Sequence, residues 1–459
     1  MPLHTEIEFE RDICQHLAAH GWQYAEPGAE GDARGWDTPR ALYPPDVLAW
    51  LQASQAQAWA QLSKLHGAAA EAVVLERLRK ALDEQGTLAV LRHGVELVGL
   101  KAPLKLAQFK PALAMNAELQ ARYAANRLRV LRQVRTNHDD IIDLVLCLNG
   151  VPVATAELKT DFTQDVNRAI DQYRFERLPR PKGRAQAEPL LDFPRGALVH
   201  FAVSNRTVFM TTRLLGPATR FLPFNQGDGG GAGNPPNGQG HRTAYLWEQV
   251  WQRDSWLEII GRYLVARRNA KKQVEAVLFP RYHQLDATRK LVQAVLAEGP
   301  GHRYLIQHSA GSGKTNSIAW TSHFLSELHD AQDRKVFSSV LVVSDRNVLD
   351  AQLQEAIFDF ERTTGVVETI TSEHGSKSAQ LGQALKDGKK IIVCTIQTFP
   401  FALDAVQELA ATEGKCFAVI ADEAHSSQTG EAAAKLKQLL SAEERAELED
   451  GGEIDTETL

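Results

Sequence analysis

Cysteine is scarce in this sequence, and so are the signals of a secreted or membrane protein. The 459 residues include only four cysteines, which are scattered along the chain: Cys14, Cys147, Cys394 and Cys416. This scarcity excludes a disulfide framework and a zinc-ligand cluster. No apolar run is long enough to span a membrane. The N-terminus also lacks the basic start and apolar stretch of a signal peptide. We therefore expect a cytoplasmic protein with no membrane partner.

An excess of basic residues is also absent. The formal net charge is -6 at pH 7, so any nucleic-acid binding must use local patches. Basic residues do gather in one part of the sequence: Arg122, Arg127, Arg129, Arg132, Arg135, Arg174, Arg177, Arg180, Lys182 and Arg184. They suit phosphate contacts. Charge runs are more often solvated faces, and the sequence leaves both interpretations open.

The chain otherwise has an ordinary globular composition, with 44% hydrophobic and 24% charged residues, and its length suggests about three domains. Helical patterns occupy the first part, at residues 6–17, 45–59, 71–82 and 116–125. Strand patterns follow at residues 128–134, 141–148, 151–159, 196–204 and 207–211. We expect a hairpin turn at Asn149-Gly150. A helix at 166–177, a loop at 225–240 and a helix at 245–267 complete this part.

A glycine-rich turn stands between an apolar stretch at 304–307, expected to be a buried strand, and an expected helix at 316–325. The turn contains Gly311, Ser312, Gly313, Lys314 and Thr315. Such a turn points backbone N–H groups at a polyphosphate. Lys314 would reach the β- and γ-phosphates, and the Thr315 hydroxyl would bind Mg²⁺. The strict pattern has glycine where His308 stands. We expect an ATP site.

A second motif supports this expectation. An apolar strand is expected at 417–421, and Asp422 and Glu423 follow it directly. Asp422 would hold the Mg²⁺ that Thr315 also touches, and Glu423 would orient and deprotonate the attacking water. The run Asp422-Glu-Ala-His425 resembles motif II of superfamily 2 helicases and translocases, the DEAH form. The resemblance implies ATP hydrolysis.

Three charged residues on the expected hairpin point to a second chemistry. Asp143 lies in its first strand, and Glu157 and Lys159 lie two residues apart in the next, so that both face one side. Carboxylates that share a sheet face repel each other unless a cation lies between them. A divalent metal would polarise a phosphodiester there and lower the pKa of a bound water, and Lys159 would position that water or stabilise the developing charge. The alternative is an ordinary strand with an edge salt bridge, and the pattern alone does not decide between them.

The wider sequence resembles the restriction subunit of type I restriction–modification enzymes, which joins a PD-(D/E)xK nuclease to a superfamily 2 DNA translocase. The resemblance runs through residues 143–159, 169–174, 195–203, 210–213, 221–225, 279–286 and 422–430. It implies that Asp143, Glu157 and Lys159 cut DNA. It also implies that Gln172 and Tyr173 support that site.

The same resemblance implies further roles. A carboxylate from an N-terminal helix usually joins the nuclease site, and Glu10 is the candidate. Gln284 matches the helicase motif that reads adenine, although a polar residue that merely starts a helix is the alternative. Ile142 stands where the nuclease motif has proline, which leaves the chemistry unchanged. The implied cofactors are ATP and Mg²⁺. The implied partners are double-stranded DNA and the methyltransferase and specificity subunits of the complex.

We expect an α/β protein in which a restriction-endonuclease-like α/β/α domain precedes a RecA-like P-loop domain with a parallel sheet. The expected divisions are a nuclease domain at 1–224, a connector at 225–275 and a first RecA-like domain at 276–459. No second RecA-like domain is visible after His425, so we expect a portion of a longer subunit. A helicase-nuclease of DNA repair and an inactive binding module remain alternatives. Nothing in the sequence indicates which DNA site is recognised.

Overall fold

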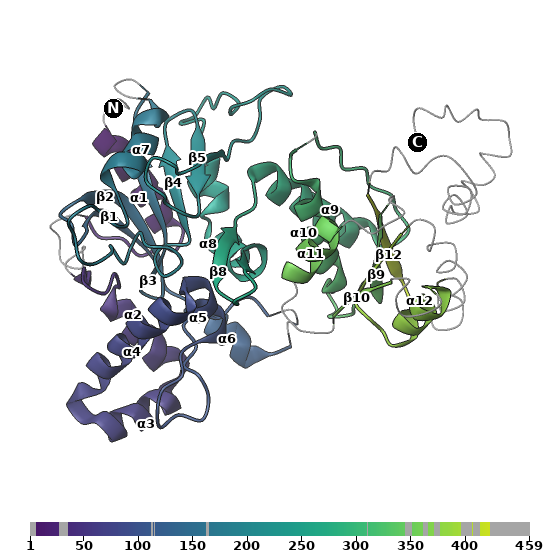
Figure 1. Ribbon diagram of the computed structural model, residues 1–459, viewed down its shortest axis with the longest axis horizontal. Helices are drawn as coiled ribbons and strands as arrows, with labels where there is room; N and C mark the ends of the chain where they lie inside the picture. Colours follow the sequence, from purple (N-terminus) through teal and green to yellow (C-terminus); the bar gives the residue numbers. More distant parts are fainter. Residues whose placement is uncertain are drawn as a thin grey trace. The chain divides into compact units, whose positions relative to one another are not determined.

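The chain forms two compact units, Met1–Tyr282 and His283–Leu459 (Figure 1). The structure is a computed structural model that describes residues 6–26, 35–111, 113, 115–161, 165–309, 311–344, 351–360, 366–370, 377–395, 406 and 414–422. Within these residues, no helix is both long and apolar enough to cross a membrane. The stretch expected to be a connector, 225–275, falls inside the first unit. The division into 1–224, 225–275 and 276–459 stays a prediction.

A six-stranded mixed sheet, in the order β1-β2-β3-β4-β5-β6, organises the first unit. Its strands are β1 (Leu128–Arg135), β2 (Ile141–Leu148), β3 (Val151–Leu158), β4 (Val199–Val203), β5 (Val208–Thr211) and β6 (Leu222–Pro223). Neighbours are antiparallel, except that β3 and β4 are parallel. The expected hairpin is confirmed, because Asn149 and Gly150 adopt the positive φ angles of 49° and 79° that a tight turn requires.

Helices flank this sheet. α1 (Glu6–Ala19) packs against β1 and β3. α7 (Val166–Asp171) continues into a π-helical turn, η3 (Gln172–Glu176), and packs against β3 and β4, which it connects. The remaining helices of the N-terminal part are α2 (Pro44–Ser54), α3 (Ala56–His66), α4 (Ala70–Gln85), α5 (Thr87–His93) and α6 (Ala117–Ala125). The two helices α1 and α7 therefore border the strands that carry the candidate nuclease residues.

The last part of the first unit corrects one expectation. A single helix was expected at 245–267, but the structure has η4 (Leu246–Val250), α8 (Arg253–Glu258) and η5 (Ile259–Tyr263), followed by β7 (Val265–Arg268). The helix is interrupted at Gln252, whose φ and ψ of -53° and 139° are not helical and whose side chain caps α8. At the end of η5, Arg92 from α5 donates to the carbonyls of Ile260 and Leu264 at 2.7 and 2.6 Å. β7 then pairs with β8 (Val274–Leu278) as a hairpin.

The second unit contains a parallel four-stranded sheet in the order β10-β11-β9-β12. The strands are β9 (Ser339–Ser344), β10 (Val367–Thr369), β11 (Ile391–Thr395) and β12 (Phe417–Ala421). Its helices are α9 (Tyr282–Glu298), α10 (Lys314–Ser326), α11 (Ala351–Asp359) and α12 (Lys377–Lys386), with α10 against α11 and β9 (Figure 1). Strands alternate with crossover helices, and the expected RecA-like class is confirmed.

One expected strand does not form. Residues 304–307 have no regular secondary structure, and the side chain of Leu305 is 84% exposed. A strand at the edge of a sheet requires a partner for its backbone groups, and within the described residues β12 pairs with β9 alone. The helix and strand expected at 316–325 and 417–421 are present as α10 and β12.

Candidate nuclease site and nucleotide-binding loop

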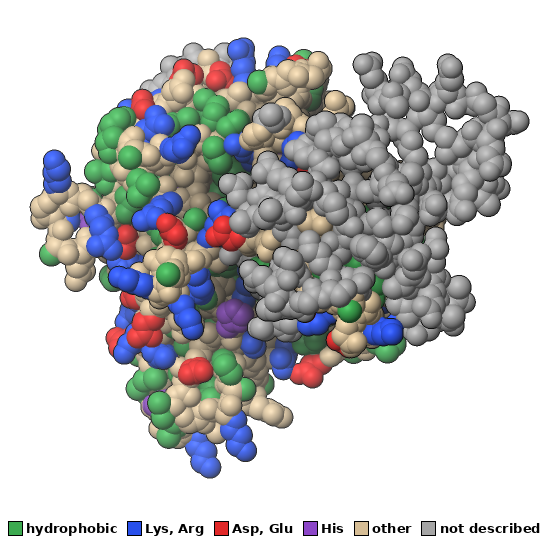
Figure 2. Space-filling model, turned by 45° about the vertical axis from the view of Figure 1, so that its right-hand side comes forward, with side chains coloured by type: hydrophobic (Ala, Val, Ile, Leu, Met, Phe, Trp, Pro, Cys, Tyr) green, Lys and Arg blue, Asp and Glu red, His purple; other side chains and the backbone are tan. Residues whose placement is uncertain are grey.

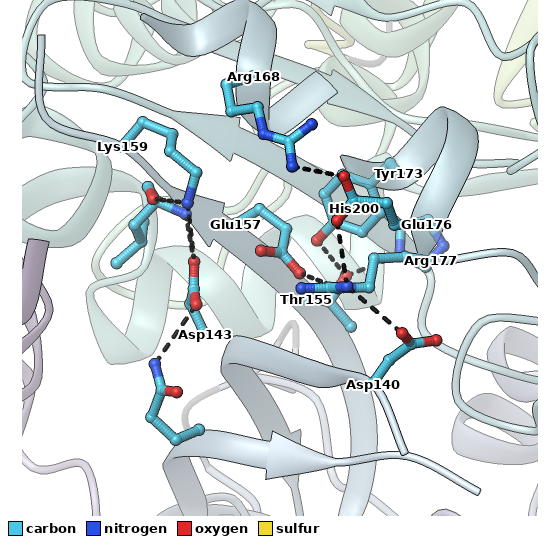
Figure 3. A network of polar contacts seen from close by, with 12 residues as sticks. Asp140, Asp143, Thr155, Glu157, Lys159, Arg168, Tyr173, Glu176, Arg177 and His200 are labelled. Carbon is cyan, nitrogen blue, oxygen red and sulfur yellow. Dashed lines mark hydrogen bonds and ion pairs between the residues drawn. The ribbon is translucent and has the colours of Figure 1, made fainter. Parts of the chain in front are cut away.

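Asp143, Glu157 and Lys159 converge in the first unit, as the sequence predicts (Figure 3). Asp143 lies on β2, Glu157 lies on β3, and Lys159 follows the end of β3. All three are buried. The Asp143 Oδ2 atom accepts a hydrogen bond from the backbone N–H of Leu158 at 2.8 Å and lies 3.9 Å from the Lys159 Nζ atom. The pairing of β2 with β3 therefore fixes the carboxylate beside the ammonium group.

Glu157 is the most deeply buried of these groups, with an exposed fraction of 0%. Burial, followed by repulsion from Asp143, raises the pKa of its carboxyl group well above the usual value. The Arg177 guanidinium, from the end of η3, opposes this shift through a hydrogen bond to Oε1 of 3.0 Å. The Oε2 atom has no hydrogen-bond partner in the described part of the chain. One oxygen of Glu157 is thus available for a further ligand.

Two carboxylates from α1 complete the cluster. Glu10 and Glu6 lie one turn apart, and their oxygens and that of Asp143 lie within 4.8 Å of one another. Glu6 Oε1 accepts from Lys159 Nζ at 2.8 Å, and Arg132 Nε donates to Glu10 at 2.6 Å. The sequence indicated Glu10 but missed Glu6, although the spacing of four residues on one helix places both on the same face.

This donor set suits a divalent cation. Carboxylate oxygens are the ligands that Mg²⁺ and Ca²⁺ prefer. Lys159 and Arg132 pair with Glu6 and Glu10, and a divalent cation would further reduce the repulsion among the three acidic side chains. The orphaned Oε2 atom of Glu157, buried beside Asp143, independently indicates a missing ligand. The residues that could hold such an ion are Glu6, Glu10, Asp143 and Glu157.

Three buried polar side chains form a hydrogen-bonded chain next to Glu157. Of these, Thr155 lies on β3, on the same face as Glu157. Thr155 Oγ1 is 2.7 Å from the Tyr173 hydroxyl and 2.7 Å from His200 Nδ1. Tyr173 is fully buried in the core, and the side-chain oxygen of its neighbour Gln172 has no hydrogen-bond partner among the described residues. Tyr173 therefore supports the strand that carries Glu157, and it does so through Thr155.

His200 should make the protein sensitive to acid. Burial lowers the pKa of His200 to about 3 from the ordinary value of 6.5. Only the unfolded chain takes up this proton between those values, so stability should fall as the pH drops from 6.5 towards 3. At pH 5 the loss should be about 2 kcal/mol. Urea unfolding at pH 7 and pH 5 measures it. The His200→Asn variant should lose about 2 kcal/mol less over this interval, and equal slopes for both proteins would contradict the assignment.

The basic residues near the candidate site, for which the sequence left phosphate contacts and a solvated face both open, are largely paired within the first unit. Several of these side chains are occupied by carboxylates of the same unit: Arg127 and Arg129 with Asp46, Arg132 with Glu10, Arg177 with Glu157, and Arg180 with Asp192. On the face shown in Figure 2, Lys and Arg side chains are interspersed with acidic and other residues. The pairs of Arg129, Arg132 and Arg177 are buried or nearly so, and they link segments of the first unit that are distant in sequence.

The expected phosphate loop lies at the start of α10 in the second unit, where Lys314 is the first helical residue. Gly313 has a φ of 88°, and a Cβ atom at this position would lie 2.6 Å from Gln284 Nε2. The backbone angle favours glycine, and a larger residue would also displace the end of the Gln284 side chain. The buried Gln284 side chain donates to the Gly313 carbonyl at 3.0 Å. Gln284 thus supports the loop, and its reading of adenine stays a prediction.

Two histidines brace the same loop. His283 Nε2 lies 3.1 Å from the Ser312 carbonyl oxygen. The His308 ring, which replaces the glycine of the strict pattern, contacts the His283 ring edge to face at 5.0 Å. The sequence did not indicate His283. A side chain at position 308 is tolerated because it packs against a residue that holds the loop.

Of the other residues expected to bind the nucleotide, the structure describes Asp422 and Thr315. Asp422 follows β12, and its backbone N–H donates to the Val343 carbonyl of β9 at 2.9 Å, so it extends the sheet at the carboxyl end of the strand. That edge is where ligands bind in open α/β sheets. Thr315 is in the first turn of α10. Glu423 lies outside the described residues.

Comparisons with known proteins give concordant results for the two units. The family described as the N terminus of type I restriction enzyme R proteins matches residues 4–218. The SWI2/SNF2 ATPase family matches residues 283–446. A putative type I restriction enzyme MjaVIIIP endonuclease subunit of Methanocaldococcus jannaschii is 23% identical over 336 residues, which cover 66% of this chain and 29% of that protein. The chain thus corresponds to under a third of the length of this relative.

Proposed function

Because the chain carries the N-terminal region of a type I restriction enzyme R protein followed by a SWI2/SNF2 ATPase region, we propose that its first unit is a Mg²⁺-dependent endonuclease for double-stranded DNA. The observation that carries this proposal is the convergence of Asp143 with Glu6 and Glu10 beside the unpartnered oxygen of Glu157. Three clustered acidic side chains, with the buried Glu157 beside one of them, are costly for stability alone, and a cation-dependent reaction explains why they are there.

Each side chain has a distinct task in this proposal. A divalent ion held by Asp143 and Glu157 would polarise the phosphodiester and lower the pKa of a bound water. The ammonium group of Lys159, fixed by Glu6 at 2.8 Å and by the Leu158 carbonyl at 2.7 Å, faces Asp143 and can stabilise charge that develops on a phosphate. Arg177 compensates part of the buried negative charge of Glu157 and keeps that side chain in place.

We further propose that the second unit hydrolyses ATP and drives DNA translocation. The N-terminus of α10 and Lys314 would bind the phosphates. Thr315 and Asp422 would hold Mg²⁺, and Glu423 would activate the attacking water. In the complete protein, this motor would pull DNA past the nuclease site, while methyltransferase and specificity subunits recognise the DNA. The nuclease domain, connector and RecA-like domain would correspond to 1–224, 225–275 and 276–459.

Removal of the metal tests the nuclease proposal directly. The purified chain, incubated with supercoiled plasmid and Mg²⁺, should nick the DNA at a low level that ATP does not regulate, and EDTA should stop the reaction completely. Added Mg²⁺ or Mn²⁺ in excess should restore it, because the acidic cluster binds either ion through oxygen ligands. An Asp143→Asn preparation, purified in parallel, excludes a contaminating nuclease. Nicking that continues in EDTA, or that is equal in the two preparations, would refute the proposal.

A further inference from the structure

The backbone of β1 is distorted at one residue, directly opposite the acidic cluster. Gln133 has a φ of 54°, in the left-handed region, where a residue other than glycine costs about 1 kcal/mol or more. The pairing of β1 with β2 is interrupted there, since Arg132 pairs with Leu144 and Val134 with Ile142, while Asp143 has no partner on β1. The register is the same on both sides of this gap, so no residue is inserted and the distortion is confined to Gln133. Residues held in the left-handed region cluster at functional sites.

The redirected side chain bridges two of the acidic residues. Gln133 Nε2 donates to Glu10 Oε1 at 2.9 Å and to Asp143 Oδ1 at 3.3 Å, so each of its two N–H groups has a carboxylate acceptor. The residue is exposed, so burial of apolar surface does not explain the strained backbone. The other non-glycine residues with positive φ on this sheet, Asp139 and Asn149, lie in its turns.

We propose that Gln133 is a positioning residue, which fixes the spacing between the Glu10 and Asp143 carboxylates so that they can share a divalent cation. This inference rests on the proposed nuclease function. A neutral amide suits the task, because it binds both carboxylates without adding the positive charge that would compete with a cation. Groups that orient metal ligands in this way typically contribute 10–100-fold to metal affinity.

A glycine substitution distinguishes the contribution of the Gln133 side chain from that of its backbone conformation. Gln133→Gly removes the amide but tolerates a φ of 54°, so the fold should be retained. Calorimetric titration with Mn²⁺ should show about 10-fold weaker binding than in the wild-type chain, after subtraction of the binding that remains in Asp143→Asn. The thermal midpoint should be equal or higher. Lys272→Gly, which relieves a φ of 61° in the β7–β8 turn, is the matched control and should bind Mn²⁺ normally.

Cleavage gives a second measurement. In Gln133→Gly, the Mg²⁺ concentration for half-maximal nicking should rise about 10-fold, and the rate at saturating Mg²⁺ should recover most of the wild-type value. Wild-type Mn²⁺ affinity in Gln133→Gly would overturn the inference, even if the wild-type chain cuts DNA. If the wild-type chain binds Mn²⁺ in a Gln133-dependent way but never cuts DNA, the nuclease proposal fails and the positioning role of Gln133 stands.

Discussion

Asparagine in place of Asp143 should abolish DNA cleavage, with a rate at least about 10³-fold lower, or about 4 kcal/mol in activation free energy. The carboxylate of Asp143 belongs to the acidic cluster and lies 3.9 Å from Lys159 Nζ. Asparagine has the same size, and its oxygen can still accept the 2.8 Å hydrogen bond from Leu158 N–H. The fold should therefore survive while the charge that binds a cation is lost. Plasmid nicking measures the rate, and circular dichroism checks the fold.

Asp139→Asn is the control for this substitution. Asp139 lies in the turn between β1 and β2, its side chain is 78% exposed, and its only described ion pair is with the exposed Arg135. The same chemical change at this position should leave cleavage unaltered, because exposed pairs contribute little to stability. If Asp143→Asn folds normally and cuts DNA within about tenfold of the wild-type rate, Asp143 would have a structural role only, and the nuclease site would have to lie elsewhere.

The β2–β3 hairpin, which carries the candidate site residues, could be predicted because the residues that specify it are adjacent in the sequence. β2 and β3 are almost fully buried apolar runs, and the Asn149-Gly150 pair between them specifies a tight turn. The turn places β2 and β3 side by side, and an irregularity between Leu146 and Cys147 then shifts the register by one residue. Leu144 therefore pairs with Ala156, which brings Asp143 beside Glu157 and Lys159. The same reasoning failed at residues 304–307, where an apolar run has no neighbouring strand among the described residues, because strand formation depends on a partner that the local sequence does not reveal.

The partners of the charged residues could not be predicted. Arg132 bonds Glu10 across 122 positions of sequence, and Arg127 bonds Asp46 across 81. Composition indicated a basic patch, whereas tertiary folding turned its arginines towards carboxylates. The position of Gln133 is hidden for a similar reason. A glutamine within a strand pattern carries no sign of a left-handed backbone, or of carboxylate partners that come from α1 and β2.

Replacement of Lys314 by alanine should weaken ATP binding to the second unit by on the order of 10²-fold. Lys314 begins α10 directly after Gly313, where the helix N-terminus and the side-chain ammonium act on the same phosphates. Alanine is a good helix former, so α10 should persist. Binding of a fluorescent ATP analogue with Mg²⁺ measures the change. Lys290→Ala on α9, which removes a 74% exposed side chain paired with Asp286, is the control and should bind normally.

Loss of DNA cleavage should leave ATP hydrolysis intact, whereas loss of ATP hydrolysis should also stop cleavage. Asp143 belongs to the first unit and Lys314 to the second. In the complete protein, Asp143→Asn should stop cutting and leave ATP hydrolysis intact, since it removes no group that touches the nucleotide. Lys314→Ala should stop hydrolysis, and with it both translocation and cutting, because cutting is proposed to wait for translocation. A full-length Lys314→Ala protein that hydrolyses no ATP yet cuts unmodified DNA at the normal rate would refute this coupling, while leaving the nuclease site in place.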